Sequence, residues 1–119
     1  MKTPELNEGE IYVGAIISAD GSKNHHIILL PGESEEIEWP GAVEWAASIG
    51  GELPDRCESA LLFATMKDNF KPEWYWLREQ HATYSCNAWC QHFSNGYQTY
   101  DLKSDELRAR AVRRLPIKD

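Results

Sequence analysis

The sequence predicts an α+β fold, and three observations in chain order support this. A β-hairpin pattern opens the chain, two stretches with helical spacing follow it, and short strand-like pieces fill the remainder. Strands and helices that are grouped in separate blocks are typical of α+β folds. With 119 residues, 42% hydrophobic and 26% charged, the chain resembles one globular domain in size and composition, so we expect a single domain over residues 1–119.

The first element predicted is the hairpin. Glu10 to Ile17 is rich in β-branched and apolar residues, and His25 to Leu30 is a second apolar run. Ala19-Asp20-Gly21 between them is a turn signal, and Pro31-Gly32 ends the second strand. The acidic stretch Glu33 to Glu38 is expected to be a solvated loop, because its like charges resist packing.

Two amphipathic helices are predicted next. Pro40 suits a first helical turn, and apolar residues recur after it at helical spacing until Gly50-Gly51 stops the run. The second helix follows Pro54, where Asp55 and Glu58 are spaced as a capping box. The positions expected to face the core are Ala42, Val43, Trp45, Ala46 and Ile49 in the first helix and Ala60, Leu61, Ala64 and Met66 in the second.

Beyond Pro72 the helical period is absent from the sequence. Strand-like pieces are expected at Trp74 to Leu77, Ala88 to Phe93 and Arg108 to Arg113. Polar segments, one of which contains Asn95-Gly96, separate these pieces. This last block therefore predicts an irregular C-terminal sheet.

Charge is distributed unevenly along the chain. Residues 1–70 hold 4 Lys or Arg against 13 Asp or Glu, whereas residues 71–119 hold 8 against 6. The net charge of −7 argues against general nucleic-acid binding, which depends on the neutralisation of phosphates. Four arginines near the C-terminus are expected to pair with the acidic first half and not to form a phosphate-binding patch: Arg108, Arg110, Arg113 and Arg114.

The sequence contains no signal-peptide core at its start and no stretch near the roughly 18 apolar residues that span a membrane. We therefore expect a cytoplasmic protein with no membrane insertion. The sequence has an odd number of cysteines, Cys57, Cys86 and Cys90, and no export signal. A disulfide framework of the secreted type is therefore not expected, and the thiols are expected to be reduced.

Several kinds of chemistry are not expected from the motifs. Cys86, Cys90 and His92, with His81 nearby, do not have a common zinc-site spacing, so no metal site is predicted. The sequence lacks a nucleophile elbow and a glycine-rich phosphate loop, so no catalytic residue and no cofactor is predicted. A well-formed pocket with perturbed titratable groups would favour an enzyme instead.

Four ordered segments of the sequence, taken together, resemble a known family. They are GGELPDRCESALLFA, WYW, AWCQHF and RARAVRRLPI. Over about residues 9–117 the chain is similar to the domain of unknown function 1566, which is common in bacteria and their phages and is related in fold to C-type lectins. The resemblance implies a C-type-lectin-like fold in which the N- and C-terminal strands lie together, two helices flank the sheets, and an irregular strand-rich region presents the ligand contacts.

The last third is also similar to the variable proteins of diversity-generating retroelements, in which adenine-templated mutagenesis rewrites selected positions. The framework of those proteins reads A-W-x-Q-x-F-x-x-G-x-Q-x-x-x-x-K-S-x-E-x-R-A-R-A-V-R-R, and Ala88 to Arg114 carries it here. The resemblance implies a bacterial or phage protein, located in the cytoplasm or in a phage particle. Between the framework positions, every residue is one that an asparagine codon can become when its first two bases are rewritten: Cys90, His92, Ser94, Asn95, Tyr97, Thr99, Tyr100, Asp101, Leu102, Asp105 and Leu107.

These positions, together with Tyr84, are the predicted recognition surface. Tyrosines among Ser, Asn, Thr and Asp have the composition of an antibody paratope. Alternation along a strand places Cys90, His92 and Ser94 on a variable side, opposite an anchoring side. Eight of the 13 aromatic residues lie between Trp74 and Tyr100, and those expected mainly in the scaffold are Trp74, Trp76, Trp89 and Phe93.

The function predicted from these observations is that of a non-catalytic ligand- or protein-binding module, with an unknown protein or cell-surface ligand as its partner. An alternative is a small phage or bacterial accessory protein that binds a basic host protein through the acidic face around Glu33 to Glu44. Both a monomer and a homo-oligomer are compatible with the sequence.

Overall fold

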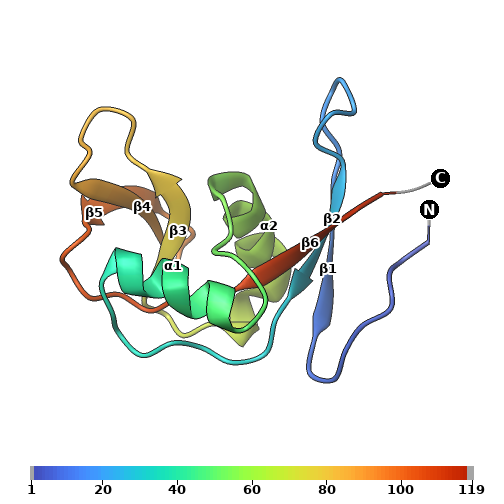
Figure 1. Ribbon diagram of the computed structural model, residues 1–119, viewed down its shortest axis with the longest axis horizontal. Coiled ribbons are helices and arrows are strands. Elements are labelled where there is room, and N and C mark those ends of the chain that lie inside the picture. The colour runs from blue at the N-terminus through green and yellow to red at the C-terminus, as the bar shows by residue number, and fades with distance from the viewer. Residues whose placement is uncertain (1, 118–119) are drawn as a thin grey trace.

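Two antiparallel sheets lie at opposite ends of the computed structural model, and helix α2 lies between them (Figure 1). The structure describes residues 2–117, so residues 1, 118 and 119 of the expected domain lie outside the described residues. The first sheet has the order β1-β2-β6 and the second the order β3-β4-β5. Their strands are β1 (Ile11–Ile16), β2 (His25–Leu29), β3 (Trp74–Gln80), β4 (Asn87–His92), β5 (Gln98–Leu102) and β6 (Val112–Pro116).

The helices complete a compact α+β domain, so the predicted class is confirmed. They are α1 (Trp39–Ser48), α2 (Arg56–Met66) and the short 3-10 helix η1 (Lys67–Asn69). Among residues 2–117, no helix has the length and apolar character needed to cross a membrane.

The predicted hairpin is confirmed as β1 and β2, which pair antiparallel with a bulge between Tyr12 and Gly14. Strand β6 pairs with the other edge of β2. Strands from the beginning and the end of the chain therefore share one sheet, with β2 between them. Both ends of the described chain emerge on this side of the molecule, at the opposite end from β5 (Figure 1).

Helix α2 begins with the predicted capping box. The Asp55 carboxylate accepts a hydrogen bond from the Glu58 amide at 2.7 Å, and the Glu58 carboxylate accepts one from the Asp55 amide at 2.8 Å. The predicted buried face is wrong at Ala60 and Ala64, which are exposed, whereas Leu61 and Met66 are half-buried and pack against the core as expected. The buried residues of α2 are Glu58, Ser59 and Leu62. Glu58 and Ser59 are buried because they make polar contacts with the two sheets. The spacing of apolar residues in the sequence does not predict such contacts.

Helix α1 buries a narrower stripe than its sequence predicts. Ala42 and Ala46 are fully buried, and Trp45 is half-buried. Val43 and Ile49 are exposed, which corrects the expectation for these two positions. The small alanines allow the helix backbone to lie close to the sheet β3-β4-β5.

The acidic stretch after the hairpin is not a freely solvated loop. The Ser34 amide donates to the Ala109 carbonyl at 2.9 Å, and Ile37 and Leu107 exchange backbone hydrogen bonds. The Glu33 carboxylate pairs with Arg108 at 3.3 Å, and Ser34 is buried. The prediction of a solvated loop is therefore wrong for Glu33 and Ser34, because an arginine offsets the acidic charge.

The arginines near the C-terminus pair with carboxylates, as predicted. Arg113 contacts Glu10 at 2.8 Å. Arg114 contacts Glu58 at 2.6 Å and Glu52 at 3.0 Å. Arg110 differs, since its guanidinium donates to the carbonyls of Asn69 and Leu30.

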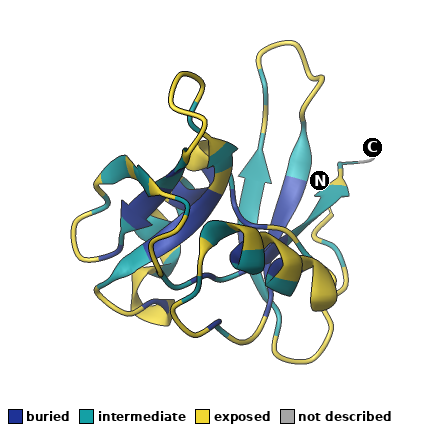
Figure 2. Ribbon diagram, turned by 60° about the vertical axis from the view of Figure 1, so that its left-hand side comes forward, coloured by how far each residue is buried: buried dark blue, intermediate teal, exposed yellow. Residues whose placement is uncertain are grey.

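Two core clusters hold the layers together, and buried segments lie where the helices meet the sheets while most loops are exposed (Figure 2). The first lies under α1 and includes Trp76, Ala88 and Cys90. The second lies around α2 and includes Leu62 and Phe93, whose ring stacks on Phe70 at 3.9 Å between centroids. Trp76 and Phe93 are thus scaffold residues as expected, while Trp74 and Trp89 are only half-buried.

The C-terminal segment differs in two places from the prediction. Strand β5 occupies a polar segment that was not expected to be a strand. The predicted strand Arg108 to Arg113 begins only at Val112, and Leu107 and Arg108 form isolated bridges to Ile37 and Tyr75. This segment crosses from one sheet to the other, so it forms only single-residue bridges with its neighbours before β6 begins.

Candidate binding surface

The expected recognition residues lie on both faces of the sheet β3-β4-β5. Directly paired residues share a face, and Trp89 pairs with Tyr100 whereas Cys90 pairs with Thr99. The face that carries Trp89 and Tyr100 is turned toward α2, and the face that carries Cys90 packs under α1. The predicted residues therefore do not form one continuous surface.

Cys90 is the clearest correction to the predicted site. Its side chain is only 1% exposed and belongs to the core cluster under α1. Burial, and secondarily the charge of Asp101, raises the pKa of its thiol to about 12. The side of β4 expected to vary is thus partly interior, because α1 covers it.

Four aromatic rings lie together beside the β3-β4 loop and form what we call the tyrosine patch: the exposed Tyr84 and Tyr100 and the half-buried His81 and Trp89. The His81 ring lies 4.2 Å from that of Tyr100 and 4.9 Å from that of Tyr84 between centroids. Tyr84 and Tyr100 are 5.9 Å apart and remain 55% and 41% exposed. Leu102, on the same strand as Tyr100, is 48% exposed.

The loop under Tyr84 is fixed by hydrogen bonds from its own backbone. The Nδ1 atom of His81 accepts the amide protons of Thr83 at 3.1 Å and Tyr84 at 3.0 Å. The Asn87 amide donates to the Tyr84 carbonyl at 2.9 Å, which closes the loop. The histidine thus acts as a local acceptor for a tight turn, and Tyr84 is held in place although its ring is exposed.

Arg56, in the first turn of α2, supports the patch from below. Its guanidinium carbon lies 3.6 Å from the Trp89 ring centroid, a cation-π contact, and its Nε donates to Gln98 at 3.0 Å. Sequence reasoning missed both Arg56 and His81. No local signal identifies Arg56, because the partners of its side chain, Trp89 and Gln98, lie more than thirty residues further along the chain.

Two glutamine amides tie the same face of the sheet to α2. Gln98 donates to the Gln91 side chain at 2.7 Å and to the Arg56 carbonyl at 2.8 Å. Gln91 is fully buried and donates to the Ser59 carbonyl at 2.9 Å. These connected hydrogen bonds, which are buried at Gln91 and partly exposed at Gln98, fix the position of the strand that presents Tyr100.

The other expected residues gather near the β4-β5 turn. Ser94 and Asn95 are exposed in this turn, and the Asn95 side chain accepts the Tyr97 amide at 2.9 Å. Tyr97 is 61% exposed, and its ring lies 6.3 Å from that of Trp74. His92 is half-buried and its ring meets Trp74 edge-on at 4.8 Å.

Trp74 and His92 line a small hollow, which we call the tryptophan pocket. Its volume is about 140 Å³. Its lining residues are Glu36, Glu73, Trp74, His92, Glu106, Leu107 and Arg108. Two residues of the predicted site, His92 and Leu107, therefore meet here and not at the tyrosine patch.

Asp101, Asp105 and Thr99 complete the expected set. Asp105 is exposed, and Asp101 and Thr99 are half-buried. Partial burial, followed by the hydrogen bond and charge of Asp105, raises the pKa of the Asp101 carboxyl. The two carboxyls are therefore close enough that a negative charge on Asp105 disfavours ionisation of Asp101.

The cysteines and histidines are dispersed. Cys57 and Cys86 are exposed free thiols, unlike Cys90. Within the described range 2–117, no three His, Cys, Asp or Glu side chains are grouped so that they could hold a metal ion.

Comparison with known proteins adds no assignment. No protein-family model and no curated protein matches the sequence. The function is therefore argued from the site itself.

Proposed function

We propose that this chain is a non-catalytic module that binds a protein through the tyrosine patch and the neighbouring edge strand β5. One observation carries the proposal. Of the eight large hydrophobic side chains that are exposed among residues 2–117, three belong to the tyrosine patch or to β5, namely Tyr84, Tyr100 and Leu102, and the rings of Tyr84 and Tyr100 are 5.9 Å apart. Clustered exposed aromatic residues are typical of protein interfaces, where tyrosine is enriched.

The way in which the patch is supported agrees with this function. Tyrosine rings give a large contact area at a low entropic cost, since few torsions must be fixed on binding. Here His81 fixes the loop under Tyr84, Trp89 meets Tyr100 edge-on, and Arg56 lies over the Trp89 ring. A surface that is ordered before binding loses less free energy when the partner arrives.

We further propose a C-type-lectin-like fold and a relation to the variable proteins of diversity-generating retroelements. The support is that, within segment 88–107, several framework residues are buried while several of the variable positions are exposed. The framework residues Gln91 and Phe93 are buried, whereas Tyr97, Tyr100 and Leu102 are exposed. Three positions depart from this division: Cys90 is buried, and the framework residues Ser104 and Glu106 are exposed.

The DNA beside the gene tests the relation to retroelements. A reverse transcriptase gene and a near-copy of the coding segment for Ala88 to Arg114, with asparagine codons at the variable positions, are expected there. Their absence from the complete locus would remove this relation and leave the binding proposal in place.

Selected binders test the binding proposal. Protein domains selected from a displayed library against the immobilised chain are measured against the double variant Tyr84→Ala, Tyr100→Ala. We expect most binders to lose roughly thirtyfold in affinity, the size of an interface hot spot. The control is Ile17→Ala, which removes another exposed apolar side chain, on the β1-β2 hairpin. Binders that respond to Ile17→Ala but not to the double variant would contradict the proposal.

The acidic face remains a second candidate, because Glu35, Glu38 and Glu44 are exposed. A partner that binds there would lose affinity steeply between low and moderate salt, since exposed charges are screened. A partner of the tyrosine patch would respond weakly to the same change.

A further inference from the structure

The tryptophan pocket combines an aromatic and apolar wall with an acidic rim. Trp74, His92 and Leu107 form the wall, and the carboxylates of Glu36, Glu73 and Glu106 stand around it. Aromatic faces and carboxylates together favour one class of ligand, the organic cation, because the ring quadrupole and the negative charges both attract it.

The arginine of the pocket does not reverse this preference. The Arg108 guanidinium is engaged by Glu73 at 2.7 Å and by Glu33 at 3.3 Å. Glu36 stands 3.7 Å from the same group. Glu33 does not line the pocket and also pairs with Lys71 at 3.6 Å. The lining itself holds three carboxylates, Glu36, Glu73 and Glu106, against the one guanidinium of Arg108, so the pocket disfavours an anionic ligand.

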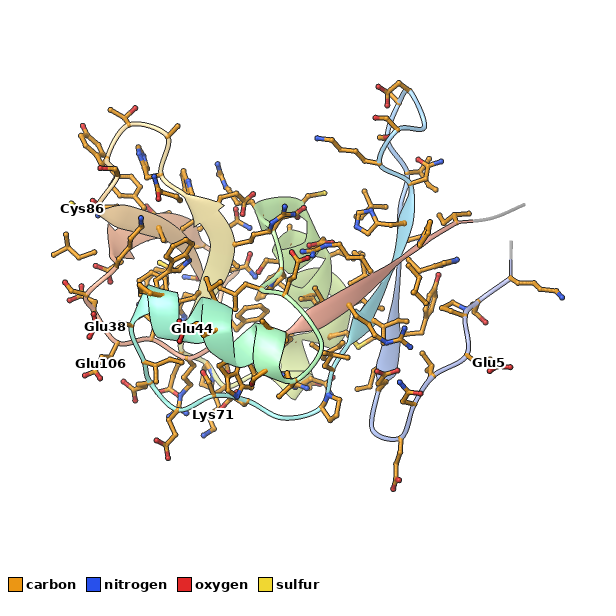
Figure 3. All side chains as sticks on the ribbon, viewed as in Figure 1. Glu5, Glu38, Glu44, Lys71, Cys86 and Glu106 are labelled. Atoms are coloured by element: carbon orange, nitrogen blue, oxygen red, sulfur yellow. The ribbon has the colours of Figure 1, made fainter. Side chains whose placement is uncertain are left out.

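Glu106 is the carboxylate most available to a ligand. It is exposed, and no cation of residues 2–117 lies within ion-pair distance of it. It also lines the adjoining hollow beside Glu38, so that the acidic rim continues around this side of the molecule. Glu38 and Glu106 lie close together, far from Glu5 near the opposite end (Figure 3).

The size of the pocket limits what can enter it. Pockets for complete small ligands usually measure about 300–1,000 Å³. The tryptophan pocket, at about 140 Å³, suits the end of one side chain. Tyr97, which is 61% exposed, lies beside Trp74 with 6.3 Å between the ring centroids.

We infer that the tryptophan pocket receives one lysine or arginine side chain of a protein partner. This inference rests on the proposed binding function and adds a specificity to it. The alkyl part of the side chain would lie against Trp74 and Leu107, and its cationic end would face Glu106 and Glu36.

A direct titration tests the inference without the natural partner. Nα-acetyl-arginine methylamide and Nα-acetyl-lysine methylamide are added to the 15N- and 13C-labelled chain, and the indole signal of Trp74 and the ring signals of His92 are followed by NMR. Saturable shifts are expected with both cations. The neutral norleucine analogue and the acidic glutamate analogue are expected to give none.

Matched variants locate the interaction. Glu106→Gln removes one rim charge at an exposed position and is expected to weaken arginine binding about threefold, within the range for exposed ion pairs. Glu36→Gln provides a second test of the rim. Glu5→Gln removes the same charge at the far end of the molecule and is expected to leave binding unchanged. Equal weakening by Glu5→Gln and Glu106→Gln would show only diffuse attraction and would overturn the inference.

Two other results would also overturn it. Equal shifts with the norleucine analogue would show that charge has no role. Much tighter binding of spermidine than of either capped residue would identify a soluble amine as the occupant in place of a partner side chain.

The inference and the binding proposal can fail separately. The cationic probes could give no saturable shift while the double variant Tyr84→Ala, Tyr100→Ala still weakens most of the selected binders. In that case only the pocket assignment is wrong. If the probes bind and the selected binders ignore the tyrosine patch, the binding proposal is wrong and the pocket remains a site for a cation.

Discussion

The three thiols of this chain lie in three different environments. Cys86 is exposed in the β3-β4 loop, Cys57 lies on the exposed side of α2, and Cys90 is buried under α1. Burial raises the pKa of the Cys90 thiol to about 12, and partial burial with nearby carboxylates raises that of Cys57. Because the thiolate is the reactive form, these environments predict an order of reactivity.

At pH 8, we expect a thiol reagent such as Ellman's reagent to modify Cys86 first, Cys57 more slowly, and Cys90 only after unfolding. Peptide mass spectrometry at successive times measures this order. The variant Cys90→Ala is expected to leave the native reaction unchanged and to remove one equivalent from the total in denaturant. Rapid native labelling of Cys90 would contradict its assignment to the core.

Gly96, in the β4-β5 turn, is a second single residue with a measurable role. Its φ is +79°, and a Cβ atom there would lie 2.8 Å from the Phe63 ring. Gly96→Ala therefore combines backbone strain with a clash, and we expect it to lower the free energy of unfolding by roughly 2–3 kcal/mol. Urea denaturation followed by tryptophan fluorescence measures the change.

Gly32→Ala is the control for Gly96→Ala. Gly32 has a φ of +90°, but nothing lies within 4 Å of the position of its Cβ. This variant reports the backbone strain alone, for which about 1 kcal/mol is expected. Equal losses in the two variants would show that contact with Phe63 is unimportant.

At the same scale, the sequence predicts which residues are chemically suited to recognition but not all of their positions. Tyr84, Tyr97 and Tyr100 are exposed as expected, whereas Cys90 is not. The pairing of Cys90 with Thr99 and the position of α1 decide this outcome. Both depend on contacts between distant segments, which alternation along one strand does not contain.

Among the elements, the two helices begin in different ways. The Asp55 carboxylate caps α2 by accepting the Glu58 amide, whereas Glu38 at the start of α1 makes no side-chain cap hydrogen bond. Asp55→Ala is expected to lower the free energy of unfolding by about 1 kcal/mol. Glu38→Ala is expected to change it by less than about 0.5 kcal/mol. Thermal denaturation followed by circular dichroism compares them, and equal effects would contradict the role of the cap.

The elements also differ in how far the sequence predicts them. Both helices carry local signals, Pro40 for α1 and the capping box for α2, and both lie where these signals predict them. Strand β5, with the sequence QTYDL, is polar because it is an edge strand with both faces partly exposed. Its formation depends on pairing with β4, so its own residues give little indication of it.

In the whole molecule, ion pairs join segments that are far apart in the chain. Glu10 before β1 pairs with Arg113 in β6, and Glu58 in α2 pairs with Arg114 in β6. His25 in β2 also contacts Glu58 at 2.8 Å. The distribution of charge along the sequence predicts this general pairing, but the partners themselves depend on the three-dimensional arrangement.

These pairs predict how stability depends on pH. Hydrogen bonds from Arg113 lower the pKa of Glu10 from 4.5 to about 2. Burial is the largest single influence on the pKa of Glu58 and raises it, but the hydrogen bonds from Arg114, the Asp55 amide and His25, together with the charge of Arg114, outweigh burial, so the pKa is lowered. A carboxyl whose pKa is lower in the folded state stabilises that state fully above its unfolded pKa and ceases to do so as the pH falls through the folded value.

We therefore expect the free energy of unfolding to fall as the pH decreases from 4.5 toward 2. In Glu10→Gln, the protein is expected to be less stable at pH 7 and to show a shallower fall in this range. Urea denaturation at a series of pH values measures both effects. An identical slope in the variant and the parent chain would show that Glu10 does not contribute.

The position of the two ends of the described chain bears on how a binding module of this kind can be attached to a larger support. Both ends of the described chain emerge beside the sheet β1-β2-β6, and β5 lies at the opposite end of the molecule (Figure 1). A support joined at either end would stand behind the proposed contact surface and leave it uncovered. Many copies on one support could then engage a repetitive target together, and weak single contacts would add through avidity, because each later contact forms at an effective concentration of about millimolar.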